Sequence, residues 1–150
     1  YIESGESALG PGGSIFIRAK DGAILEGGSV EVVAGGTGGH ASKGGSMTIA
    51  AGEGSNDDEG DGGNGGTLTL SGGFANGRAK IDVGGDAILR GGDSMKGQGG
   101  SVLVSSGFSS DGLSGKTSIE SAPSGPNGVS GDVYISSGES EAGSSGMIVL

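Results

Sequence analysis

Short stretches of alternating apolar and polar residues recur along the whole chain, and most are bounded by glycine. The clearest is Gly100–Gly107, which reads Gly-Ser-Val-Leu-Val-Ser-Ser-Gly. The first inward position of each stretch falls at residues 15, 30, 47, 68, 87, 102, 117, 133 and 148, so the intervals are 15, 17, 21, 19, 15, 15, 16 and 15 residues. Alternation with a period of two is typical of a β-strand that turns one face inward. A repeat of this length therefore predicts a repetitive β architecture.

The repeat predicts an all-β fold, a parallel β-solenoid (β-helix) of about eight to nine coils of 15–21 residues. The connections are longer than two-residue hairpin turns, and they are long enough to return the chain to its starting side. Equivalent residues would then stack at about 4.8 Å in parallel ladders. One coil buries too little apolar surface to offset its ordering entropy, so only a stack would be stable. We expect residues 1–150 to form a single array, and to be a segment of a longer chain or an assembly subunit.

Each predicted strand has an inward and an outward side chain. The inward residues form a predicted core ladder of Ile15, Val30, Met47, Leu68, Val102, Val133 and Ile148. The outward residue between two inward ones should be polar in an isolated solenoid, yet it is often large and apolar. These outward residues form a predicted assembly stripe of Tyr1, Phe16, Ile88, Leu103, Tyr134 and Val149. Such a stripe marks an interface, covered either by the chain's own loops or by another subunit.

Composition narrows the function classes. The chain has 39 glycines among 150 residues, no cysteine and a net charge of −10. We expect the glycines to serve turns with positive φ and close approach between neighbouring coils. The negative charge disfavours a nucleic-acid partner. No apolar run is long enough to predict a membrane span, and the absence of cysteine excludes a disulfide framework.

The acidic stretch within residues 53–66 is predicted to protrude as a loop between two coils. Its carboxylates could hold Ca²⁺, although their spacing matches no EF-hand and a solvated run of charge is the favoured interpretation; they are Asp57, Asp58, Glu59 and Asp61. No other cofactor is expected. His40 is the only histidine, and nothing in the sequence places a serine and a carboxylate beside it, so we expect no enzyme.

The stretch Gly99–Gly107 and its relative Ser130–Gly138 resemble the Gly/Ser/Asp-rich β-solenoid repeat proteins of microalgal cell surfaces and extracellular fibres, and more distantly the solenoid stalks of adhesins. The resemblance implies an extracellular or cell-surface location, and it carries over no functional residue. We expect a structural module of an extracellular fibre, sheath or surface appendage. Its partners would be further copies or a related structural subunit, with O-linked glycans on loop serines. The alternative is an ice- or surface-binding adhesive solenoid, with or without calcium, although only Thr67–Thr69 shows a Thr-x-Thr pattern.

Overall fold

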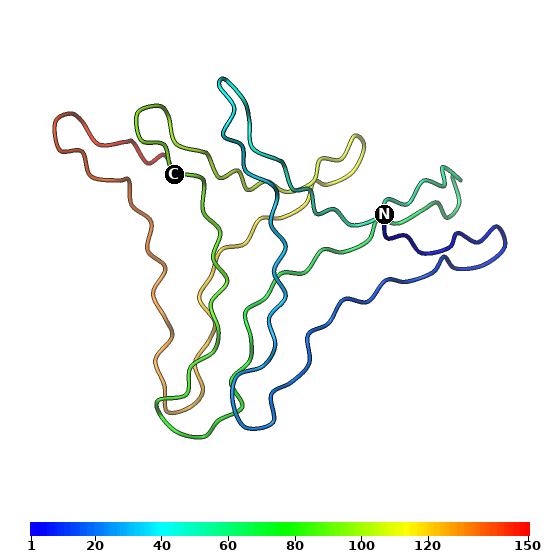
Figure 1. Ribbon diagram of the computed structural model, residues 1–150, viewed down its shortest axis with the longest axis horizontal. Coiled ribbons are helices and arrows are strands. Elements are labelled where there is room, and N and C mark those ends of the chain that lie inside the picture. Colours follow the sequence, from blue (N-terminus) through cyan, green and yellow to red (C-terminus); the bar gives the residue numbers. More distant parts are fainter. The chain divides into compact units, whose positions relative to one another are not determined.

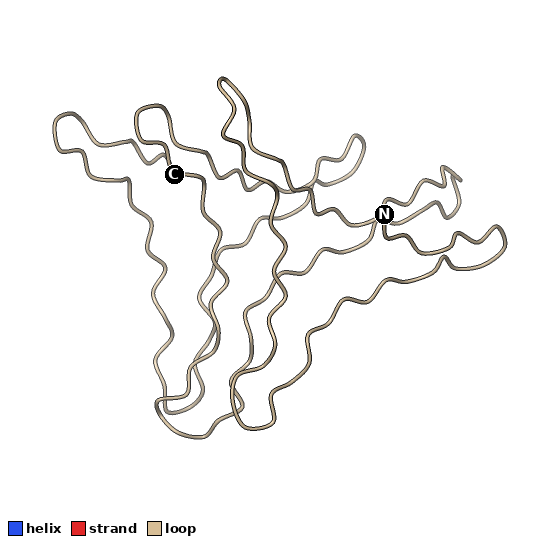
Figure 2. Ribbon diagram, in the orientation of Figure 1, coloured by secondary structure: helices blue, strands red, loops and turns tan.

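The computed structural model describes residues 1–150 and contains neither a helix nor a strand (Figures 1 and 2). The chain divides into two units, Tyr1–Ser71 and Gly72–Leu150. In each unit, extended segments alternate with loops (Figure 1). The predicted parallel β-solenoid is therefore wrong, because no sheet and no ladder between successive repeats is present.

Seven loops are closed at their base by one backbone hydrogen bond, in which the N–H of a glycine donates to the carbonyl of the residue that begins the loop. The N–O distances are 2.8–2.9 Å, and the closed loops are 5–13, 20–28, 35–45, 52–66, 73–85, 92–100 and 107–115. We call the two bonded residues of each loop its neck. Two further loops, 122–131 and 138–146, occupy the equivalent places in the repeat without that bond. These nine loops take up the connections of the sequence repeat.

The closed necks explain why no sheet forms. The solenoid prediction required each connection to carry the chain across to the start of the next coil. A loop that begins and ends at one point cannot do this, so the next segment starts where the previous one stopped. All ten backbone hydrogen bonds of the chain lie within loops. The extended segments therefore keep their inner N–H and C=O groups unpaired with other backbone.

Close approach, and not an unusual φ, explains the glycine that closes six of the seven necks; at Gly66 a Cβ would make only ordinary contacts, of 3.4 Å and more. A Cβ on Gly100 would lie 2.9 Å from the backbone nitrogen of Gly92, and one on Gly85 would lie 3.0 Å from that of Gly73. Nothing lies within 4 Å of a Cβ built on Gly92 or Gly73. The opening position accordingly accepts a side chain in loop 20–28, which begins at Lys20. No glycine has positive φ, so the sequence-based expectation of left-handed glycine turns is wrong.

The residue before each loop is also small, because it lies against the closing glycine. The Cβ of Ala19 would lie 3.1 Å from a Cβ on Gly28, and that of Ser106 would lie 3.3 Å from one on Gly115. Only alanine, serine or glycine occupies this position along the chain, at residues 4, 19, 34, 51, 72, 91, 106, 121 and 137. Five of these nine are among the eight half-buried residues of the chain. The residues that precede the loops are therefore among the better-packed points of the chain.

Four loops share the sequence Gly-x-Ser-x-x-Gly-x-x-Gly, starting at residues 5, 92, 107 and 138. In each of them the serine hydroxyl accepts a hydrogen bond from the backbone N–H of the second glycine. The distances are 2.9–3.0 Å, and the serines are Ser7, Ser94, Ser109 and Ser140. Serine commonly satisfies turn backbone in this way. Three of these four loops are closed at the neck and loop 138–146 is not, so the motif is a local signal for the serine turn inside the loop, which apolar periodicity does not contain.

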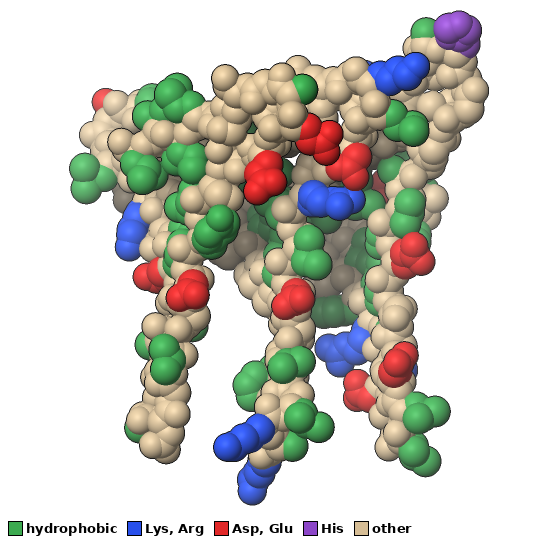
Figure 3. All heavy atoms as spheres, turned by 90° about the vertical axis from the view of Figure 1, so that its left-hand side faces the viewer, with side chains coloured by type: hydrophobic (Ala, Val, Ile, Leu, Met, Phe, Trp, Pro, Cys, Tyr) green, Lys and Arg blue, Asp and Glu red, His purple; other side chains and the backbone are tan.

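No side chain in the chain is buried, and the accessible surface is 15109 Å². A folded monomer of this mass would expose about 6,700 Å² and a fully extended chain about 20,400 Å². The predicted core ladder is not a core: its members are 44–55% exposed, at Ile15, Val30, Met47, Leu68, Val102, Val133 and Ile148. Figure 3 shows apolar side chains lying openly along the surface. The apolar stretches are therefore left without an intramolecular partner.

Candidate association surface

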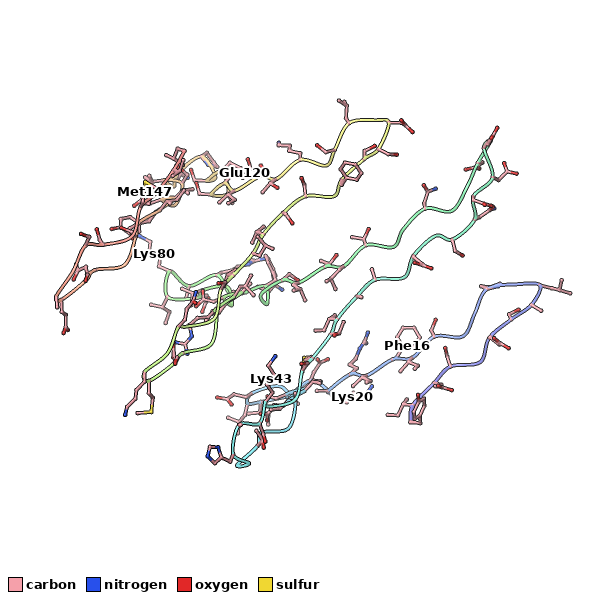
Figure 4. All side chains as sticks on the ribbon, turned by 90° about the horizontal axis from the view of Figure 1, so that it is seen from above. Phe16, Lys20, Lys43, Lys80, Glu120 and Met147 are labelled. Atoms are coloured by element: carbon pink, nitrogen blue, oxygen red, sulfur yellow. The ribbon has the colours of Figure 1, made fainter.

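The predicted assembly stripe is exposed but is not gathered into one surface. Its members are 77–115% exposed and lie on separate segments, and they are Tyr1, Phe16, Ile88, Leu103, Tyr134 and Val149. Figure 4 shows the ring of Phe16 standing away from the ribbon. Because no sheet aligns the segments, these side chains form no contiguous stripe. The same absence of a sheet leaves Thr67 and Thr69 without a flat threonine array around them.

The exposed element that recurs along the chain is the extended segment between two loops. In several segments the apolar side chains alternate in exposure, as at Val102 (51%) and Leu103 (89%). The backbone groups between the necks are unpaired with other backbone. Unpaired N–H and C=O groups along an extended segment are a template for pairing with another chain. Each segment thus presents both an apolar and a hydrogen-bonding surface.

The net negative charge of the chain lies in the loops and not in these segments. Thirteen acidic and four basic side chains lie inside the nine loops, their end residues excluded, which gives the loops −9 of the chain's net charge of −10. The segments, with the loop-end residues, hold the remaining five acidic and four basic residues and are close to neutral. The one ion pair, Arg90 with Asp93 at 3.3 Å, is exposed and contributes little to stability. Five of the nine loops are net acidic, loop 52–66 most strongly, so two copies of such a loop repel each other.

Loop 52–66 carries the largest share of this charge, and its tip is organised by Asp58. One carboxylate oxygen of Asp58 accepts hydrogen bonds from the N–H groups of Gly60 at 2.8 Å and Asp61 at 3.3 Å. The side chain of Asn56 accepts a further bond from the N–H of Asp58 at 3.1 Å. The pKa of Asp58 lies below its ordinary value because the bond from Gly60, and then that from Asp61, favours the ionised form.

We expect the tip of loop 52–66 to loosen in acid. A depressed pKa makes this contribution complete above the ordinary value of 3.8, and it is lost as the pH falls through the lower pKa of the closed loop. Carboxyl NMR of Asp58 should give a lower midpoint in water than in concentrated urea. Equal midpoints would contradict the assignment. As a control, Asp58→Asn should make the amide hydrogens of Gly60 and Asp61 exchange faster than in the unchanged chain above the pKa of Asp58, and this difference should disappear below it.

The structure does not bring together the residues of the other predicted sites, the calcium site and a site around the single histidine. No three acidic, histidine or cysteine side chains gather to hold a metal ion, and the carboxylates of Asp57, Glu59 and Asp61 do not converge with that of Asp58. The calcium prediction stays a prediction, to be tested by whether a chelator lowers the melting temperature. The structure has no pocket, and the single histidine is exposed within loop 35–45 (purple, Figure 3). The chain has no helix, and hence none of the length and hydropathy that crossing a membrane requires.

No family model, curated protein or solved structure matches this chain.

Proposed function

We propose that the chain is a structural module of an extracellular fibre, sheath or surface appendage that becomes ordered by associating with other copies. The observation that carries the proposal is the absence of any buried side chain, with 15109 Å² of surface exposed. Ordering a residue costs about 1–2 kcal/mol of backbone entropy, which burial normally offsets. A single chain with no core does not offset that cost. A partner that covers the segments would.

The arrangement of the segments supports association over a solitary role. Each segment is extended and free of proline, since Pro11, Pro123 and Pro126 all lie in loops, and the segments taken together are close to neutral. Low charge, β-branched residues and no proline are the features of segments that pair between chains. The acidic loops keep the assembled surface in contact with water. In the assembled module, the extended segments would pair with other copies, and the acidic loops would face water.

The proposed location rests on the resemblance of the Gly/Ser/Asp-rich repeat to proteins of microalgal cell surfaces and extracellular fibres. The partner would be a further copy, or a related structural subunit with the same repeat. Loop serines are open to O-linked glycans, and mass spectrometry of the native protein would detect them. No catalytic role is proposed.

We expect the purified chain to associate as its concentration rises, and to form rods or filaments in electron microscopy. Sedimentation velocity should show the monomer decreasing as large species appear. A chain with the same 150 residues in shuffled order is the matched control, because it keeps glycine content and charge but loses the repeat. Persistent monomers at every concentration would contradict the proposal, as would equal assembly of the shuffled chain.

A further inference from the structure

Among the segments that have a loop at both ends, segment 100–107 is the one that combines no charge with large apolar side chains on both faces. It contains only glycine, serine, valine and leucine. Val102, Leu103 and Val104 are consecutive and are 51%, 89% and 64% exposed. Two other segments between loops, 45–52 and 66–73, are also uncharged, but they place threonine between their large apolar residues. Among these segments, 100–107 therefore has the most apolar surface free of charge. Residues 146–150 are also uncharged and apolar, but the loop before them, 138–146, has no closing backbone bond.

Closed loops hold both ends of this segment. Gly100 N–H donates to Gly92 O at 2.8 Å, and Gly115 N–H donates to Gly107 O at 2.9 Å. Between these necks, Ser101–Ser106 make no backbone hydrogen bond and no side-chain hydrogen bond. The donors and acceptors of the segment are thus free between two closed loops. Another strand can pair with them without breaking a backbone hydrogen bond of the segment.

The spacing of the loops selects the partner. Segments 85–92, 100–107 and 115–122 are each eight residues long and separated by protruding loops. A partner that pairs along this region must place its own loops at the same intervals, or the loops of the two chains would collide. A second copy of this chain meets that condition. Residues 100–107 of that copy are also uncharged, so pairing the two segments brings no like charges together within the segments.

We infer that a second copy docks on segment 100–107 by backbone pairing, parallel and in register, with its own residues 100–107. Parallel pairing leaves each copy with a second free edge, so the contact repeats into a filament. Equivalent residues of the two copies would lie about 4.8 Å apart. This inference rests on the proposed self-association, and it names the segment that carries it.

The test compares Leu103→Lys with Leu113→Lys. Both leucines are exposed, at 89% and 99%, and both changes add one positive charge to an acidic chain. Leu113 lies in loop 107–115, outside the paired segment. We expect Leu103→Lys to raise the concentration needed for assembly by about tenfold or more, because each copy loses buried leucine surface and gains a charge. Leu113→Lys should assemble at least as readily as the unchanged chain, because its charge offsets that of Asp111 in an acidic loop. Equal behaviour of the two variants would overturn the inference.

Cysteine cross-linking tests the register without altering the leucines, because the chain has no cysteine of its own. A mixture of Ser101→Cys and Ser106→Cys chains, assembled and then oxidised, should give only 101–101 and 106–106 disulfides. Disulfides form when the Cα atoms are about 4.4–6.8 Å apart. Mixed 101–106 disulfides, or none, would overturn parallel pairing. If the unchanged chain never assembles, the proposed function fails; if it assembles but these results are absent, only the assignment to segment 100–107 fails.

Discussion

Replacing Gly100 with alanine is expected to open loop 92–100. The added Cβ would lie 2.9 Å from the nitrogen of Gly92, which is backbone and cannot swing aside as a side-chain tip can. The closing hydrogen bond would lengthen or break, and such a bond contributes about 0.5–1.5 kcal/mol net. Hydrogen exchange of the amide at residue 100 should become faster by about tenfold, since tenfold corresponds to about 1.4 kcal/mol.

The matched control is Gly92→Ala, at the other side of the same neck. Nothing lies within 4 Å of a Cβ at Gly92, and its φ is not positive. Alanine there reduces the freedom of the open chain and should stabilise the loop by about 0.4–1 kcal/mol. The two substitutions therefore have opposite expected signs. Equal exchange rates in both variants would show that crowding by the closing glycine does not control the neck.

Salt is expected to promote assembly strongly. In-register copies bring like loops together, and loop 52–66 holds five acidic residues and no basic one. Their repulsion is screened as the Debye length falls from about 30 Å at 0.01 M salt to about 10 Å at 0.1 M. The concentration needed for assembly should fall by about tenfold or more over that range, because the repulsion recurs at every copy. Light scattering along a sodium chloride series would measure it.

A triple variant separates the acidic loop from general salt effects. Asp57→Asn, Glu59→Gln and Asp61→Asn remove three charges and leave Asp58 to organise the tip. At low salt this variant should assemble at a lower concentration than the unchanged chain, and at high salt the two should converge. Assembly that salt weakens would instead show that opposite charges hold the copies together, and it would refute repulsion between the acidic loops.

The division of the chain into segments and loops was predictable from the apolar pattern, but the course of the chain was not. The structure places an extended segment at residues 100–107, where alternation predicts one. A connection that returns across a stack and a loop that closes on itself both have glycine ends and polar interiors. They differ by one backbone hydrogen bond, such as that between Gly100 and Gly92, which leaves no mark on apolar periodicity.

The burial of the side chains could not be predicted from the apolar alternation either. Alternation orders the exposures of Val102 and Leu103 in the expected sense, but burial also needs a neighbouring segment within contact distance. That neighbour depends on long-range geometry, which the closed loops change. The close packing around the glycines, by contrast, could have been predicted from nearby residues. The small residue before each loop and the shared Gly-x-Ser-x-x-Gly-x-x-Gly sequence both indicate a crowded neck, whereas glycine content alone suggests left-handed turns.

The proposed function depends on extended segments that have no partner within one chain and gain one from another copy. Amide hydrogen exchange of the dilute monomer and of the assembled material distinguishes these two states residue by residue. In the monomer, the loop-closing amides such as Gly100 should be slowed, while Ser101–Ser106 exchange as in an open chain. In the assembly, Ser101–Ser106 should become protected. Strong protection of Ser101–Ser106 already in the dilute monomer would contradict the proposed association, because the chain would then pair with itself.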